Sequence, residues 1–361
     1  MKIIFFSSWG TRCGIADYSC NLMEGLRRSG VEVSVVPLDD ARSSSDFARL
    51  GKEMNGGDIA HIQHEYGFFG EGLAGWARNF RSFIRQIRVP WVVTLHELMA
   101  PSADKPLYGL RRAVISSVHR RLLSRAALVI VHLRKQRETL ISIGIPPSKV
   151  AVMQLPVPEL KSSAMSPEDC KALLGLEGKK IVTIFGYVVD RKGYDVALRA
   201  MSDTGDITLL IAGGPPQGDK SGYFESLSAL TGLQDRVKIT GYIEDSQIDT
   251  IMGATDLVLA PFKEASGSSS LSLALAYHKP ILASDIEAIR EIREDGLEMG
   301  SFKSGDSRDL AQKAREILED PVLMDRLANS SRLYAERFGY SSSAKTAAGL
   351  YADILGSGGQ Q

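Results

Sequence analysis

Short apolar runs that alternate with helical patterns are the feature that most restricts how this chain can fold. The runs are rich in β-branched and aromatic residues, which favour strands. Amphipathic stretches such as Asp17–Ser29 and Leu110–Arg125 lie between them. The six runs in the first half are Ile3–Ser7, Val31–Leu38, Ile59–Gln63, Trp91–His96, Leu128–His132 and Val150–Leu155. This alternation predicts an α/β fold, in which a parallel sheet carries helices on both faces.

The alternation stops once and then begins again. Leu155–Pro167 is rich in proline and serine, which predicts a linker between domains. The runs beyond it are Lys180–Gly186, Ile207–Gly213, Val237–Gly241, Leu257–Phe262 and Pro280–Ser284. With 361 residues, the chain is long enough for two hydrophobic cores. We therefore expect two Rossmann-like domains, residues 1–157 and 158–339, and a final helix over residues 340–356 that packs back on the first domain.

The charge balance and the cysteines exclude several classes of protein. The 43 basic and 43 acidic residues cancel, so bulk charge predicts no nucleic-acid partner. Cys13, Cys20 and Cys170 have no CxxC spacing, which argues against a disulfide framework or a zinc site and favours a reducing, cytoplasmic compartment. The run Met1–Phe6 is too short for a signal peptide and is expected to form a buried strand.

The most informative stretch of the sequence lies near its end. A predicted strand ends at Phe262, the polar loop Lys263–Ser270 follows, and an apolar helix covers Leu271–Tyr277. Backbone N–H groups at the start of a helix bind anions, and Gly267 permits a close backbone approach. The carboxylate of Glu264 can hold sugar hydroxyls in the same space. The alternative is an ordinary strand–loop–helix crossover with no ligand.

This stretch resembles the signature of the family-4 retaining glycosyltransferases of GT-B fold. The residues in register with that signature are Pro261, Glu264, Gly267, Ala274, Pro280, Ala283, Ser284 and Asp285. The resemblance covers nearly the whole chain and is most specific over residues 181–290. It implies two Rossmann-like domains that face each other across a cleft, the first on the acceptor side and the second binding a nucleotide sugar. It also implies transfer of a hexose-type sugar from a nucleotide-diphosphate sugar to a hydroxyl of a glycan, polysaccharide or glycolipid precursor.

A second segment, Phe185–Asp195, resembles the strand and phosphate-binding loop of the same family. Lys192 matches the family lysine, whereas the usual family arginine is replaced by Tyr187, so Arg191 is the candidate substitute. A site without a metal needs fixed cations to stabilise the departing diphosphate. No Asp-x-Asp or compact His/Asp/Glu cluster is present, so we expect no metal and no cofactor. The alternative is a surface turn with solvated charges.

Several other residues are donor-binding candidates on the strength of the resemblance. Gly14 matches the glycine-bearing loop after the first strand. The sequence has no G-x-G-x-x-G fingerprint, which argues against a nicotinamide dehydrogenase. The second glutamate of the family signature is replaced by Ser272, which can make a hydrogen bond but not a charge-assisted pair. The remaining donor-binding candidates are Gly186, Gly213, Gly241, Tyr242, Gly267, Ser268 and Ser269.

Two strands of the first half end in polar residues, and strand ends are where side chains reach a ligand. His96 matches a family histidine next to the transferred sugar. The acceptor-side candidates are Asp17, Tyr18, His64 and Glu65. His96 and His64 could instead be satisfied structural histidines, and we expect that role for His61, His119 and His278.

The predicted catalytic residues are therefore His96, Glu264, Arg191 and Lys192. Catalysis would rest on positioning and electrostatics, with the acceptor attacking the face from which the diphosphate leaves. Two alternatives stay open. One is a nucleotide-sugar epimerase or phosphorylase of similar fold. The other, motivated by Ser272, is a sugar-nucleotide-binding homologue without activity.

Basic residues concentrate in the stretch 78–138. It contains thirteen basic and three acidic residues, which gives a net charge of about +10. One interpretation is a pair of solvated helix faces. The other is attraction to anionic lipid headgroups or to a phosphate-bearing acceptor, which would place the protein at the inner membrane face.

Overall fold

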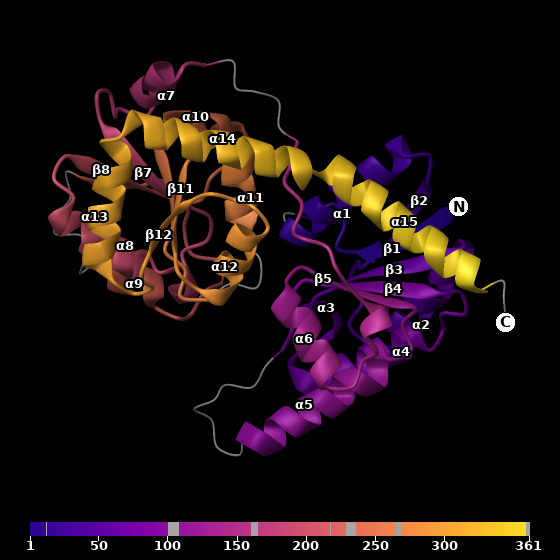
Figure 1. Cartoon of the computed structure of the whole chain (residues 1–361). Helices are drawn as coiled ribbons and strands as arrows, with labels where there is room; N and C mark the ends of the chain where they lie inside the picture. The colour runs from indigo at the N-terminus through magenta and orange to yellow at the C-terminus, as the bar shows by residue number, and fades with distance from the viewer. Residues whose placement is uncertain are drawn as a thin grey trace. The chain divides into compact units, whose positions relative to one another are not determined.

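Two parallel sheets organise the computed structural model, which describes residues 1–11, 13–99, 108–159, 165–216, 218–228, 236–264 and 269–358. Each sheet belongs to its own unit (Figure 1). The first unit comprises Met1–Pro156 and Phe338–Gln361, and the second comprises Val157–Arg337. The division follows Pro156, inside the stretch whose proline and serine content predicts a linker.

The sheet of the first unit has six parallel strands in the order β2-β1-β3-β4-β5-β6. Its strands are β1 (Lys2–Ser7), β2 (Glu32–Pro37), β3 (Ile59–His64), β4 (Trp91–Leu95), β5 (Leu128–Val131) and β6 (Val150–Val152). Its helices are α1 (Gly14–Arg28), α2 (Ser44–Glu53), α3 (Tyr66–Phe69), α4 (Gly72–Ile84), α5 (Tyr108–Leu123), α6 (Arg134–Ser142), α15 (Tyr340–Gly358) and the 3₁₀ turns η1 (Met54–Gly56) and η2 (Pro147–Lys149). The predicted α/β class is confirmed.

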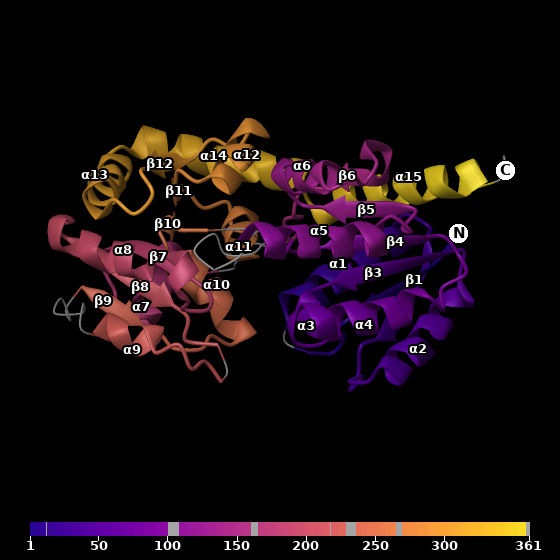
Figure 2. The same cartoon turned by 90° about the horizontal axis from the view of Figure 1, so that it is seen from below.

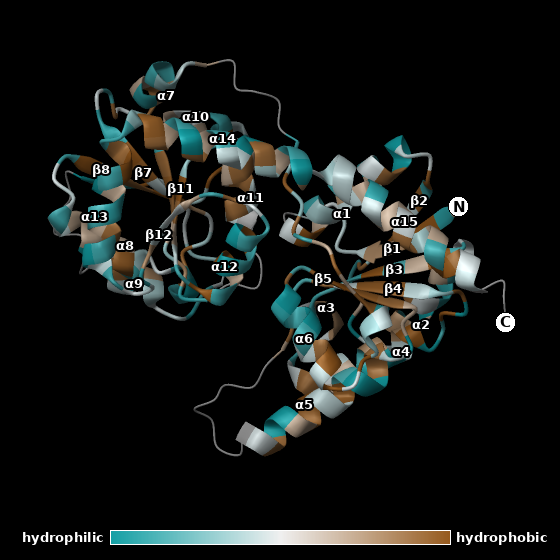
Figure 3. Cartoon of the chain, viewed as in Figure 1, coloured by the Kyte–Doolittle hydropathy of each residue, from teal (hydrophilic) through white to brown (hydrophobic). Residues whose placement is uncertain are grey.

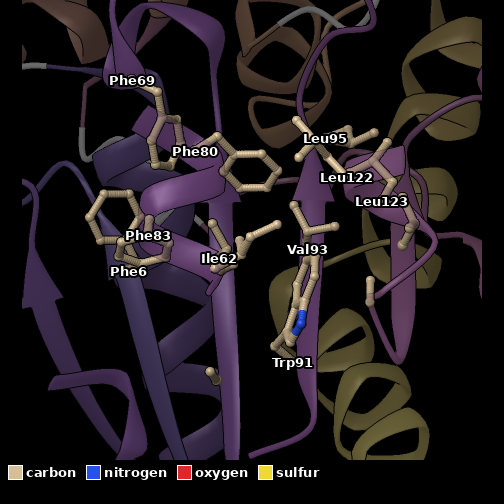
Figure 4. Close-up of a cluster of buried hydrophobic side chains, with 14 of the residues drawn as sticks. Phe6, Ile62, Phe69, Phe80, Phe83, Trp91, Val93, Leu95, Leu122 and Leu123 are labelled. Atoms are coloured by element: carbon tan, nitrogen blue, oxygen red, sulfur yellow. The ribbon is translucent and has the colours of Figure 1, made fainter. Parts of the chain in front are cut away.

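Alternate residues of each strand enter separate cores on the two faces of this sheet. Ile62 and Val93 pack in an aromatic-rich core (Figure 4) with α2 and α4, which lie side by side (Figure 2). The opposite face packs against α1 and α15, which lie together. A Cβ atom on Gly25 of α1 would lie 2.7 Å from the Cβ of Ala344, so glycine allows this close helix contact.

The second unit has the strand order β12-β11-β10-β7-β8-β9, also parallel. Its strands are β7 (Lys180–Phe185), β8 (Ile207–Ala212), β9 (Val237–Ile239), β10 (Leu257–Ala260), β11 (Ile281–Ser284) and β12 (Gly300–Phe302). Its helices are α7 (Pro167–Leu173), α8 (Tyr194–Ala200), α9 (Tyr223–Ser228), α10 (Asp245–Ala254), α11 (Ser269–Ala276), α12 (Glu287–Glu294), α13 (Ser307–Leu318), α14 (Pro321–Arg337) and the 3₁₀ turns η3 (Asp190–Lys192) and η4 (Met201–Asp203).

Both faces of the second sheet are covered as well. Val182 and Leu209 pack toward α8 and α13, whereas Ile181 and Leu210 pack toward α7 and α10. Burial on both faces explains why the strands are nearly continuous hydrophobic runs (Figure 3). No helix in the described part of the chain is long and apolar enough to cross a membrane.

Each sheet has one point where the chain reverses its direction of growth. In the second unit, the chain runs from β7 outward to β9 and then returns to β10 on the other side of β7. In the first unit, the corresponding reversal lies between β1 and β3. Open α/β sheets bind ligands beyond the carboxyl ends of the strands at such points. The loops after β1, β3, β7 and β10 are therefore where a site is expected.

Candidate functional site

The loops after β7 and β10 are joined by backbone contacts. The carbonyl of Arg191 accepts hydrogen bonds from the N–H groups of Lys263, at 2.9 Å, and Glu264, at 3.3 Å. Gly193 has a left-handed φ of 71°, and a Cβ atom there would lie 1.9 Å from the carbonyl oxygen of Pro261. Only glycine fits this crossing. The predicted phosphate-binding loop is thus held against the predicted sugar-binding loop.

Lys192 projects its cation into this junction. Its Nζ donates to the Phe185 carbonyl at 3.1 Å and to Ser270 Oγ, in the first turn of α11, at 3.5 Å. The side chain is half-buried, and burial, with a smaller contribution from Arg191, lowers its pKa to about 8. A Cβ atom on Gly186 would lie 2.5 Å from Nζ, so Gly186 makes room for the ammonium group.

Arg191 and Glu264 are exposed beside Lys192. The Arg191 side chain makes no ion pair with any residue that the structure describes. Gly267 and Ser268 lie outside the described residues, and of Ser269 only the backbone, at the start of α11, is described. Arg191, Lys192 and Glu264 therefore lie on two loops that are in backbone contact.

The other donor-binding candidates of the second unit shape its backbone. A Cβ atom on Gly213 would lie 2.0 Å from the Gly186 carbonyl oxygen, so the loops after β7 and β8 touch there. Gly241 has a φ of 72°, and Tyr242 beside it is 53% exposed. Ser272 is buried in α11, with 7% of its surface exposed. Tyr242 is thus accessible beyond the strand ends, whereas Ser272 is enclosed in its helix.

An ion-pair network that the sequence does not predict supports the phosphate-binding loop from beneath. Lys263 forms ion pairs with Asp190 at 2.6 Å and Asp195 at 3.0 Å. Burial alone would lower the lysine pKa, but the hydrogen bonds with both carboxylates outweigh it and raise the pKa. Tyr223 donates to Asp195 at 3.1 Å. These contacts hold both ends of the phosphate-binding loop against Lys263, in the loop after β10.

In the first unit, His96 follows β4 and is half-buried. Its Nε2 lies 2.9 Å from Gln63 Oε1, and its Nδ1 lies 3.2 Å from His132 Nε2. Burial, followed by the neighbouring His132, lowers the pKa of His96 well below its usual value. His96 is therefore a neutral imidazole with partners on both ring nitrogens.

The acceptor-side prediction for His64 is wrong. His64 is the last residue of β3 and points into the core shared with α4, where it is fully buried. Trp76 Nε1 donates to His64 Nε2 at 2.7 Å, and Phe69 and Phe80 pack against the ring. Burial lowers its pKa to about 3. The residue has a structural role, the alternative that the sequence left open.

The prediction that Tyr18 contacts the acceptor directly must also be corrected, because Tyr18 is only 2% exposed. Its ring meets the His96 ring edge-on, with centroids 4.8 Å apart, so it supports His96 instead. Gly14 and Asp17 are exposed in the first turn of α1, and Glu65 is half-buried before α3. These three lie after β1 and β3, at the reversal point of the first sheet.

The expected structural histidines give two outcomes. His61 bonds to Tyr351 and Thr94, and His119 bonds to Tyr66, so both are satisfied core residues as predicted. The prediction that His278 is a structural histidine is wrong, because His278 is exposed in a left-handed turn with φ of 53°. His132 is a partner of His96 that was not among the predicted site residues, although His132 ends a predicted strand just as His96 does.

Within the described residues, no group of three or more His, Cys, Asp or Glu side chains is placed to hold a metal ion. The site that the structure does assemble is a set of cations and polar groups at strand ends. Two six-stranded parallel α/β units, each with polar groups beyond its strand ends, have the architecture of the GT-B fold.

Comparison with known proteins identifies the family. Residues 167–334 match the glycosyl transferases group 1, and residues 37–156 match the glycosyl transferase 4-like domain. Together these matches cover most of the chain, and both identify glycosyltransferase domains. The expectation of a family-4-like chain of GT-B fold is thereby confirmed.

The individual relatives share only about a quarter of their aligned residues with this chain. The chain is 27% identical over 186 residues to an alpha-D-kanosaminyltransferase of Streptomyces kanamyceticus, a match that covers 50% of this chain and 47% of that one. It is 27% identical over 311 residues to a phosphatidyl-myo-inositol mannosyltransferase of Mycobacterium leprae, covering 83% and 75% of the two chains. The crystal structure of Anabaena HepE with UDP and glucose has a TM-score of 0.78 at 19% identity, covering 98% and 100%, which shows the shared fold.

Proposed function

We propose that this protein transfers a hexose-type sugar from a nucleotide-diphosphate sugar to an acceptor hydroxyl, with retention of configuration and without a metal. The observation that carries the proposal is the pair Arg191 and Lys192 at the reversal point of the second sheet, held there by Gly193 and Lys263. The UDP complex of HepE, which has the same fold, supports a nucleotide-diphosphate donor.

The proposed reaction breaks the bond between the sugar C1 and the diphosphate oxygen. The acceptor oxygen forms the new bond to C1 on the same face, and its proton passes to the leaving phosphate. Negative charge grows on the diphosphate as it leaves, and fixed cations stabilise that charge more than they stabilise the bound donor. Lys192 and Arg191 supply those cations, and Glu264 accepts hydrogen bonds from sugar hydroxyls.

The first unit contributes sugar and acceptor recognition in this proposal. His96 is neutral, so it acts as a hydrogen-bonding group beside the sugar rather than as a charge. Gly14 offers its backbone after β1, and we assign Asp17 and Glu65 to hydrogen bonds with acceptor hydroxyls. His64 and Tyr18 have no direct contact with the acceptor because both are buried.

A donor panel tests the proposal. The full chain is incubated with UDP- and GDP-hexoses in EDTA, with glycan, inositol-lipid and aminocyclitol acceptors, and release of nucleoside diphosphate is measured. We expect acceptor-dependent release, a product with the donor's anomeric configuration by NMR, and a loss of more than about tenfold in the Arg191→Ala/Lys192→Ala double variant. Near-wild-type turnover of that variant would refute the phosphate role.

The same panel separates the two alternatives. An epimerase or phosphorylase would consume the nucleotide sugar without an acceptor. The inactive homologue, suggested by Ser272, would bind nucleotide but show neither transfer nor donor hydrolysis with any donor. Either result would replace the transfer proposal.

We further propose peripheral contact with an anionic membrane through α5, on the cytoplasmic side. The segment 108–125 has five arginines and no acidic residue. Leu110 and Val114, one helical turn apart, are 61% and 46% exposed beside the exposed Arg111 and Arg112. Exposed apolar residues flanked by arginines favour the surface of an anionic bilayer.

Sedimentation with phosphatidylcholine vesicles, with and without phosphatidylserine, tests this contact. We expect binding only to the anionic vesicles, weakened by salt and by Arg111→Gln/Arg112→Gln, with Arg199→Gln as a control on the second unit. Equal sedimentation with both vesicle types would mean that these arginines form a solvated helix face.

A further inference from the structure

A row of polar side chains runs beneath two helices of the first unit. His61 and Gln63 of β3 and Thr94 of β4 point to the face covered by α1 and α15, because residues two apart share a face. His96 and His132 follow β4 and β5 on the same side. Apart from His96, each of these side chains is at most 3% exposed. Buried polar groups of this kind need hydrogen-bond partners.

The hydrogen bonds join the row at both ends. At one end, Tyr351 Oη of α15 lies 2.6 Å from His61 Nδ1, and His61 Nε2 lies 2.8 Å from Thr94 Oγ1 and 3.4 Å from the Gln63 amide. At the other end, His132 Nδ1 lies 2.9 Å from the carbonyl oxygen of Met153. Gln63 and His132 then meet His96 from its two sides.

The Met153 carbonyl sets the direction of these hydrogen bonds. A carbonyl only accepts, so His132 Nδ1 carries a proton. Burial keeps His132 neutral by lowering its pKa to about 4, so His132 Nε2 has a lone pair and accepts from His96. His96 Nδ1 is therefore the donor. Because His96 is also neutral, its Nε2 has a lone pair and needs a donor from Gln63.

The Gln63 side chain can meet that requirement. Its amide oxygen and nitrogen have nearly the same shape, and the network decides which end faces which partner. With the NH₂ group toward His96, the oxygen faces His61, whose Nε2–H then has two acceptors, Thr94 Oγ1 at 2.8 Å and the Gln63 oxygen at 3.4 Å. His61 Nδ1 then accepts from the Tyr351 hydroxyl. In this arrangement the Tyr351 hydroxyl and one ring N–H of each of the three histidines have an acceptor.

We propose that His132 and Gln63 are positioning residues that hold His96 as the neutral tautomer with its proton on Nδ1, and that Tyr351 anchors the far end of the row. Only the link to catalysis rests on the proposed function. In this tautomer, His96 Nε2 can accept a hydrogen bond from a sugar hydroxyl in exchange for the Gln63 amide. It has no proton to give to the leaving group.

The tautomer can be read directly in the free protein. The full chain has six histidines, so long-range ¹H–¹⁵N spectra of histidine-labelled protein are simple, and His96→Gln assigns the signal of interest. We expect Nδ1–H for His96 and His132 and Nε2–H for His61 at neutral pH. An Nε2–H or doubly protonated His96 would overturn the proposal. This readout needs no sugar, so it stands even if no transfer activity is found.

Kinetics test the link to catalysis. His132→Phe removes the acceptor for His96 Nδ1–H, whereas His132→Gln retains an oxygen there. We expect His132→Phe to lower kcat by about tenfold or more with little change in donor KM, and His132→Gln to recover most of that loss. His119→Gln, a buried histidine outside the row, is the control for general destabilisation. Equal kcat losses in His132→Phe, His132→Gln and His119→Gln would contradict a positioning role.

Discussion

At the scale of single residues, the charge of Lys192 depends on pH in the range of ordinary assays. Its pKa is lowered to about 8, first by burial and then by Arg191, so the free protein loses this charge as pH rises past that value. A bound diphosphate favours the protonated amine and raises its pKa. We predict that affinity for a nucleoside diphosphate changes little between about pH 7 and pH 8 and falls above that range, by up to about tenfold per pH unit.

Calorimetric titrations across this pH range measure the effect. Lys192→Arg is the matched control, since arginine stays charged, and its affinity for the nucleoside diphosphate should stay level. If the affinity of the wild-type protein for the nucleoside diphosphate does not decline above pH 8, Lys192 does not face the diphosphate.

His64 gives a second residue-scale prediction. His64→Phe leaves the Trp76 indole N–H buried without an acceptor, so the free energy of unfolding should fall by about 1–3 kcal/mol. His64→Gln keeps an acceptor and should cost less. Urea unfolding measures both variants. A rise in acceptor KM with unchanged stability would return His64 to the acceptor site.

At the scale of elements, the loop after β7 depends on its contact with the loop after β10. In Gly193→Ala, the new Cβ would lie 1.9 Å from the Pro261 carbonyl oxygen, so the two loops must move apart. Gly178→Ala is the control, because Gly178 has a similar φ of 68° and open space around it. Its cost is only the left-handed backbone penalty of about 1 kcal/mol.

We predict that Gly193→Ala weakens nucleoside diphosphate binding and destabilises the protein more than Gly178→Ala does. Thermal unfolding with and without nucleotide measures both effects. Equal behaviour of the two variants would show that the crossing of the two loops does not position Lys192.

The same elements show what sequence could predict. Strands buried on both faces form continuous apolar runs, and this is why β3, β4, β7 and β8 were found within about a residue of their bounds. β12 was missed because Gly300–Phe302 has a single large apolar residue. Burial on both faces also hides which way a residue points, so His64 was assigned to the wrong side.

The support beneath the phosphate-binding loop was missed for a different reason. Lys263 meets Asp190 only because β10 lies next to β7, and these residues are 73 positions apart. The local resemblance to a glycosyltransferase signature identified Lys192 and Glu264 but contains no information on such long-range pairs.

At the scale of the whole molecule, buried histidines make the free energy of unfolding depend on pH in the acidic range. Burial lowers the pKa values of His61 and His64 to about 3 and of His132 to about 4, from 6.5. The unfolded chain therefore binds more protons than the folded one below pH 6.5, and folding stability is lost as pH falls toward these values.

We predict that acidification from pH 7 to pH 5 lowers the free energy of unfolding by roughly 1–2 kcal/mol for each of these histidines. Urea unfolding at several pH values measures this loss, with His278→Gln, an exposed position, as the control. A stability that does not change between neutral pH and pH 5 would contradict the burial of these three side chains.

Titration of a nucleoside diphosphate into the wild-type protein and the Arg191→Ala/Lys192→Ala variant, in EDTA and at constant salt, tests the central claim most directly. We predict that the variant loses at least about tenfold in affinity for the diphosphate and almost none for the corresponding nucleoside. Equal diphosphate affinity in the two proteins would show that these cations do not hold the donor.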